Sequence, residues 1–148
     1  DLKAEQYAIT GMVFGIAGLI TGMIWARFTW GAFWVNDTKL NGAAAAMLMY
    51  AAYFILRQST EDETKRAKLS AVYLVFAFPL MMAFIYILPR MTDSLHPGNG
   101  GNPAFGQYDL DNQMRLVFYP AIMGWTLLGV WITSIRIRIK KLWNSHEN

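Results

Sequence analysis

Residues 7–25 read YAITGMVFGIAGLITGMIW, an apolar stretch without one charged side chain. Three further stretches share this character and lie at 40–56, 69–89 and 116–135. A helix needs roughly 20 apolar residues to cross the hydrocarbon core of a bilayer, and each stretch approaches that length. The helices of a soluble four-helix bundle, the competing interpretation, are usually shorter or amphipathic. The sequence therefore predicts an all-α integral membrane protein, with four transmembrane helices in a single membrane domain over residues 1–148.

The composition agrees with this class. Of the 148 residues, 55% are hydrophobic and 16% are charged, against roughly 25% charged in average soluble proteins. The low charge excludes intrinsic disorder, and the absence of cysteine excludes disulfide scaffolds, Fe–S clusters and thiol chemistry. The first stretch is not expected to be a cleavable signal peptide, because Asp1, Lys3 and Glu5 precede it in place of a purely basic region.

Basic residues are unevenly shared among the connecting segments. The connection between the second and third stretches carries four of them between residues 57 and 68, and the tail after the fourth stretch reads RIRIKK at 136–141. The long connection 90–115 has basic residues only at its two ends. By the positive-inside rule, the second connection and both termini are predicted to be cytoplasmic, and the first and third connections lie together on the outer face.

Proline and glycine suggest how the spans are shaped. Pro79 is predicted to kink the third span, because it removes a helical hydrogen bond. Gly11, Gly15, Gly18 and Gly22 recur at spacings of three or four residues in the first span, so they share one face and favour close helix packing.

The first outer connection is dense in aromatic residues. Trp25, Trp30, Phe33 and Trp34 lie within ten residues of one another. On a short interfacial helix Trp30 and Trp34 would share a face, since they are four residues apart, and Phe33 would lie beside them. Such a shelf suits a large planar ligand. An ordinary aromatic belt at the membrane interface is the alternative that these residues leave open.

The second outer connection presents a histidine. His96 precedes the turn-forming run PGNGGNP at 97–103, so residues 95–105 are predicted to form an irregular loop. Pro97 restricts His96 to an extended backbone, whereas the other histidine, His146, lies on the predicted cytoplasmic side. A neutral imidazole beside a flat aromatic wall is what an iron porphyrin needs. An ordinary surface histidine is the alternative.

Other chemistries lack their residues in this chain. There is no glycine-rich loop followed by Lys-Ser/Thr for a nucleotide phosphate. There is no histidine pair with the spacing of a zinc site. The four apolar stretches hold no carboxylate, which argues against an intramembrane proton relay.

The segment WGAFWVNDTKL at 30–40 resembles the tryptophan-rich "WWD" signature of haem-handling cytochrome c assembly proteins, and most closely the haem exporter protein C (CcmC) family. Trp30, Gly31, Trp34, Asp37 and Leu40 match the family pattern W-G-x-x-W-x-W-D-x-R-L. Position 36 is Asn where the family has Trp, and position 39 is Lys where it has Arg. The order of the spans and a histidine in the outer loop before the last span also match.

The resemblance implies which residues bind haem. His96 would be the axial ligand of the haem iron, and no residue would be catalytic. Asp37 would either cap or orient its loop or contact polar groups of the haem. The implied haem-binding residues are Trp30, Gly31, Phe33, Trp34, Asp37 and His96.

The resemblance also implies a function without bond-making. The protein would bind haem b and present it at the outer face of the bacterial inner membrane, with the loops of the signature and of His96 in the periplasm. It would hand haem to a periplasmic haem chaperone for cytochrome c maturation. ABC-transporter-type subunits and small helper membrane proteins would be its partners, and nucleic acid would not. Members of the family resemble six-span proteins, of which this chain would be the last four spans. A holocytochrome c synthase-type protein and a haem-free structural or permease-like subunit are the alternatives.

Overall fold

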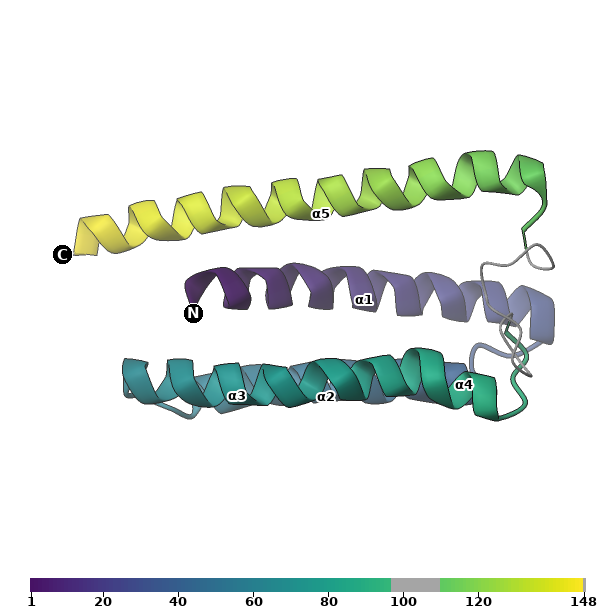
Figure 1. The fold of residues 1–148 in the computed structure, drawn as a ribbon, viewed down its shortest axis with the longest axis horizontal. Helices are drawn as coiled ribbons and strands as arrows, with labels where there is room; N and C mark the ends of the chain where they lie inside the picture. The colour runs from purple at the N-terminus through teal and green to yellow at the C-terminus, as the bar shows by residue number, and fades with distance from the viewer. Residues whose placement is uncertain (97–109, 148) are drawn as a thin grey trace. The chain divides into compact units, whose positions relative to one another are not determined.

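The computed structural model describes residues 1–96 and 110–147. This part of the chain is helical and contains no β-strand. In chain order the helices are α1 (Leu2–Trp30), α2 (Thr38–Gln58), α3 (Glu63–Met82), the π-helix η1 (Ala83–Ile87), α4 (Leu88–Met91) and α5 (Asn112–Glu147) (Figure 1). The elements α3, η1 and α4 follow one another without a break and count as one span. Four helical runs are thus long and apolar enough to cross a membrane, and the predicted all-α class with four such helices is confirmed.

The surface of these helices is apolar. Large side chains such as Phe28, Val75, Leu116 and Leu127 are mostly exposed, and few hydrophobic side chains are buried. Soluble monomers rarely expose so many large apolar side chains, whereas a bilayer would cover them. The surface therefore favours the membrane protein over the soluble bundle.

Polar and glycine residues set the helix ends. Helix α1 ends where Gly31 adopts φ +82°, a left-handed conformation that favours glycine. Helix α3 begins after Asp62, whose side chain accepts a hydrogen bond from the Lys65 N–H at 2.6 Å. The helices continue beyond the predicted apolar stretches. With 36 residues, α5 is about 54 Å long and includes the basic residues 136–141.

Pro79 lies inside α3 and is followed by a widened turn. The N–H of Ala83, where η1 begins, donates to the carbonyls of both Pro79 and Leu80. The structure shows a π-helical segment here, and the helical run continues through it to Met91. The predicted kink at Pro79 stays a prediction.

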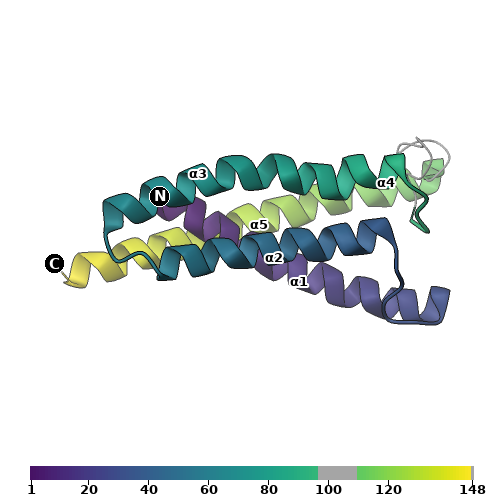
Figure 2. The ribbon, with the colours of Figure 1, turned by 90° about the horizontal axis from the view of Figure 1, so that it is seen from below.

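Helices α2 and α3 form an antiparallel hairpin (Figure 2). Near the turn that joins them, the Arg57 guanidinium donates to the Ser70 hydroxyl at 3.1 Å. Further along, the Tyr73 hydroxyl donates to the Met49 carbonyl at 2.8 Å. This register brings the start of α2 next to the end of α4, where the predicted site residues lie.

Gly42 allows α2 to approach η1 closely. A Cβ atom at position 42 would overlap the main-chain carbonyl of Phe84. Because this neighbour is backbone, no side-chain rotation would relieve the overlap, so the close approach requires glycine. Of the glycines predicted to form a packing face in α1, Gly15 lies against the Met47 side chain of α2. The other three have no such neighbour within their own unit.

Contacts divide the chain into two units, residues 15–109 and the pair formed by residues 1–14 and 110–148. In the second unit the start of α1 runs antiparallel to α5. The Thr133 hydroxyl donates to the Thr10 hydroxyl at 2.9 Å, and the Arg136 Nε donates to the Gln6 side chain at 3.1 Å. The predicted single membrane domain within a six-span fold stays a prediction.

Candidate functional site

Asp37 is the N-cap residue of α2. Its backbone is extended, and its Oδ1 atom accepts hydrogen bonds from the N–H groups of Lys39 at 3.0 Å and Leu40 at 3.3 Å. Aspartate is among the preferred residues at this position because its carboxylate satisfies N–H groups that have no partner within the helix. The helix start therefore fixes the place of the carboxylate.

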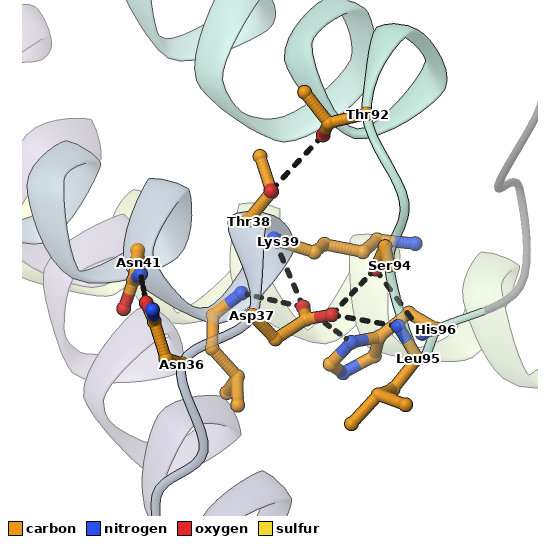
Figure 3. Close-up of polar contacts among 10 residues, drawn as sticks. Asn36, Asp37, Thr38, Lys39, Asn41, Thr92, Ser94, Leu95 and His96 are labelled. Carbon is orange, nitrogen blue, oxygen red and sulfur yellow. Dashed lines mark hydrogen bonds and ion pairs between the residues drawn. The ribbon is translucent and has the colours of Figure 1, made fainter.

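The same carboxylate holds the segment that follows α4. Its Oδ2 atom accepts hydrogen bonds from the Ser94 hydroxyl at 2.8 Å and from the Leu95 N–H at 2.7 Å. Its Oδ1 atom lies 2.9 Å from Nδ1 of His96. Figure 3 shows these bonds converging on one side chain. Asp37 thus joins two segments that are almost 60 residues apart in the chain.

The environment keeps Asp37 ionised. Burial raises the pKa of its carboxyl group, since the side chain is only 1% exposed. Hydrogen bonds from the Leu95 N–H, the Ser94 hydroxyl, the Leu40 N–H and the His96 ring act in the opposite direction, and together they hold the pKa of Asp37 below its ordinary value. An ionised carboxylate can only accept hydrogen bonds.

The carboxylate determines how the His96 ring is presented. Because Asp37 only accepts, the proton of a neutral His96 imidazole lies on Nδ1, and the lone pair lies on Nε2. Nε2 is on the side of the ring away from Asp37 (Figure 3). The backbone N–H of His96 donates to the Ser94 hydroxyl oxygen at 3.1 Å, which also ties down the main chain. The side chain is 23% exposed, so the ring is partly accessible.

Trp30 completes this cluster from α1. The Trp30 and His96 rings meet edge to face, with centroids 4.8 Å apart and an interplanar angle of 77°. Trp25 packs edge to face on Trp30 at 5.0 Å. The structure thus brings together three of the predicted residues, Trp30, Asp37 and His96.

The predicted interfacial helix is wrong. Trp30 is the last residue of α1, Gly31 turns the chain, and residues 34–37 are not helical. Trp30 and Trp34 therefore share no helix face. Phe33 and Trp34 are exposed, at 55% and 38%, and lie in the connection that leads to Asp37.

Several residues of the cluster were missed by the sequence reasoning. The Ser94 hydroxyl donates to the Asp37 carboxylate and accepts from the backbone N–H of His96. Its position two residues before His96 was the one feature of the sequence that could have indicated this role. A second link between the same segments is the hydrogen bond from the Thr92 hydroxyl to the Thr38 hydroxyl, at 3.0 Å. Of the predicted His96 loop, the residues from 97 onward lie outside the described residues.

The arrangement fits a metal that brings its own ligands. Within residues 1–96 and 110–147, no three His, Cys, Asp or Glu side chains are grouped to hold a bare ion. A single imidazole, oriented by a carboxylate and flanked by an indole, would suit an iron porphyrin, because the porphyrin supplies four nitrogen ligands of its own. The donor set therefore fits haem better than a free metal ion.

Comparisons with known proteins give the family. A sequence model described as "Heme exporter protein C" matches residues 1–147. Heme exporter protein C of Escherichia coli K12 is 25% identical over 138 residues, covering 93% of this chain and 54% of that protein. The Paracoccus denitrificans protein of the same name is 28% identical over 137 residues, covering 93% and 56%. Cytochrome c biogenesis protein CcsA of Prochlorococcus marinus is 41% identical over 71 residues, covering 48% and 23%.

This chain thus spans about half the length of the exporter proteins that it matches. The match extends over nearly every residue of the chain, including the segment 30–40 and His96. The chain belongs to the Heme exporter protein C family.

Proposed function

We propose that this chain binds haem and presents it for cytochrome c maturation. The observation that carries the proposal is the cluster of Asp37, His96 and Trp30, in which a buried carboxylate orients an imidazole beside an indole. When bound, haem would supply an iron that His96 Nε2 would ligate. Trp30, Gly31, Phe33 and Trp34 would line the porphyrin.

Non-covalent haem b is the form that the residues favour. A covalent c-type attachment needs cysteine thiols, and this chain has none. Within this chain, the haem would be held by the His96 imidazole and by apolar contacts, without a covalent bond to the porphyrin. It would therefore stay releasable, which suits handover to a periplasmic haem chaperone without any bond-making by this protein. We include ABC-transporter-type subunits and small membrane proteins as partners in this proposal.

The proposed topology places the cluster in the periplasm. The α2–α3 hairpin has the cluster at one end. At the other end is a turn with Arg57 before it and Lys65, Arg66 and Lys68 after it. The positive-inside rule assigns that turn to the cytoplasm and therefore the cluster to the outer face.

Absorbance spectroscopy of the full-length protein in detergent tests the haem site. We expect a Soret band from added haem b that His96→Ala removes and that His146→Ala, the matched control, leaves intact. Exogenous imidazole should restore the band to His96→Gly, because it fills the ligand position. A Soret band unchanged in His96→Ala would refute the site.

The aromatic wall has its own test. Trp30→Ala and Trp34→Ala should weaken haem retention by up to about tenfold, since an aromatic contact contributes roughly 0.5–1.5 kcal/mol beyond its area. Trp143→Ala near the end of α5 is the control. Variants that disappear from the membrane while the remaining protein keeps full haem would support an ordinary aromatic belt instead.

A synthase role is the second candidate, because the chain also matches a protein named for cytochrome c biogenesis, CcsA. A purified-component assay separates the two. Thioether formation on an apocytochrome by this protein alone supports the synthase, whereas transfer of unmodified haem to a chaperone supports presentation.

A further inference from the structure

Asp37 contacts both the start of helix α2 and the imidazole ring of His96, which we propose as the ligand of the haem iron. It accepts from two N–H groups at the start of α2, from the Ser94 hydroxyl and Leu95 N–H, and from Nδ1 of His96. A residue needed only as a helix cap would use the first two bonds. The other three all serve the segment that carries the imidazole.

We propose that Asp37 is the positioning residue of the haem ligand: its carboxylate fixes the Nδ1–H tautomer of His96, directs Nε2 toward the iron and favours the ferric state. This inference rests on the proposed function and adds a role for a residue that does not itself touch the iron.

Geometry supports the positioning role. The Oδ1 to Nδ1 distance is 2.9 Å, within the range of a charge-assisted hydrogen bond. The carboxylate is 1% exposed, so water competes little for it. Its own position is set by the rigid start of α2, and the backbone of the ligand segment is held at Ser94 and Leu95 by the same side chain. The ring therefore has little freedom to turn or to exchange tautomers.

The electronic consequence follows from the charge. A carboxylate that accepts from Nδ1–H increases the basicity of the ligating nitrogen. A more basic imidazole stabilises the more highly charged ferric ion more than the ferrous ion. Hydrogen bonding behind an axial ligand is one of the ways in which a protein tunes haem iron.

Two substitutions separate this role from helix capping. Asp37→Ser keeps a preferred N-cap residue for α2, but its shorter side chain cannot reach His96. Asp37→Asn keeps size and cap and removes the charge. Thr92→Val is the matched control, because it breaks the neighbouring link to Thr38 without touching Asp37 or His96.

The first measurement needs no haem. In the full-length protein labelled with ¹⁵N-histidine, we expect neutral His96 to carry its proton on Nδ1, with Nε2 unprotonated. Asp37→Ser should shift the population toward the Nε2–H tautomer, and Thr92→Val should not. His146→Gln assigns the signals within this chain, which has two histidines. A wild-type His96 protonated mainly on Nε2 overturns the proposal.

The second measurement is made on haem-loaded protein. Asp37→Ser should bind ferric haem about 10- to 100-fold more weakly, as for other partners of metal-ligating histidines. If the affinity for ferrous haem falls tenfold less than the affinity for ferric haem, the midpoint potential rises by about 59 mV. Asp37→Asn should raise the potential in the same direction. The role of Asp37 is refuted if both variants keep the potential and the haem affinity of the wild type while His96 is still the ligand. That result would leave the proposed function intact. Wild-type protein that binds no haem through His96 overturns the proposed function, while the tautomer result still stands.

Discussion

Replacing Gly42 by alanine should weaken both the α2–α3 hairpin and the site at its end. The new Cβ atom would overlap the Phe84 carbonyl, which is main chain and cannot rotate away. The helices must therefore separate at this level. Because Gly42 is little more than one turn from Asp37, the separation should also loosen the bonds between Asp37 and the segment at Leu95.

The magnitude is the balance of two effects. Alanine is favoured over glycine in a helix interior by about 0.8–1.0 kcal/mol. Overpacking of a close contact costs typically 1–3 kcal/mol. The overlap outweighs the helix propensity, and we expect a net loss of about 1 kcal/mol in the free energy of unfolding.

Gly18→Ala is the matched control, because its Cβ would meet no atom within 4 Å. This variant keeps the gain in helix propensity without an overlap with another atom. The two variants should therefore differ by about 2 kcal/mol in the free energy of unfolding. For a chain of this size that difference corresponds to roughly 4–8 °C in melting temperature. The assay is thermal unfolding of both variants in the same detergent, with hydrogen exchange of the Leu95 amide as the local probe. If Gly42→Ala melts at or above the temperature of Gly18→Ala, the close approach of α2 to η1 is refuted.

Three further outcomes are expected. The pKa of Asp37 in the folded protein lies below its ordinary value of 3.8, so the hydrogen bonds of Asp37 contribute their full stability above pH 3.8. This stability is lost as the pH falls through the lowered pKa of the folded protein. Protection of the Leu95 amide, corrected for intrinsic exchange, should therefore stay constant from neutral pH to about 4 and then fall. A double-mutant cycle of Thr10→Val and Thr133→Val should give a coupling of about 0.6 kcal/mol, the average for hydrogen bonds between membrane helices, and zero coupling would show that the bond contributes nothing. A cysteine introduced at Glu61, in this chain without cysteine, should react with an impermeant thiol reagent from the cytoplasmic side, and labelling of intact cells from outside would reverse the topology.

The sequence singled out the candidate residues, but it did not predict how they are arranged. Trp30, Asp37 and His96 were singled out from residue type and from a family resemblance, and the structure places them together. The role of Asp37 stayed open, because an aspartate before a helix has an adequate local explanation as a cap. The partnership with His96 involves residues 59 positions apart, and no local pattern reports it.

The interfacial helix failed for a related reason. A spacing of four between Trp30 and Trp34 has meaning only if both residues are helical. Gly31 ends α1 between them with φ +82°, and the connection onward to Asp37 is not helical. The four-residue spacing of the tryptophans does not show that a helix ends at the glycine between them.

Apolar stretches by themselves determined the all-helical class and the four long helices, because a bilayer leaves the backbone no partner for its hydrogen bonds except its own helix. Only the tertiary structure decided the contacts that make the site. The antiparallel register of α2 and α3, which Gly42 permits, carries the start of one helix to the end of the other, and there the Asp37 carboxylate meets the His96 imidazole. Such a meeting depends on the packing of segments distant in the chain, which periodicity and composition do not encode.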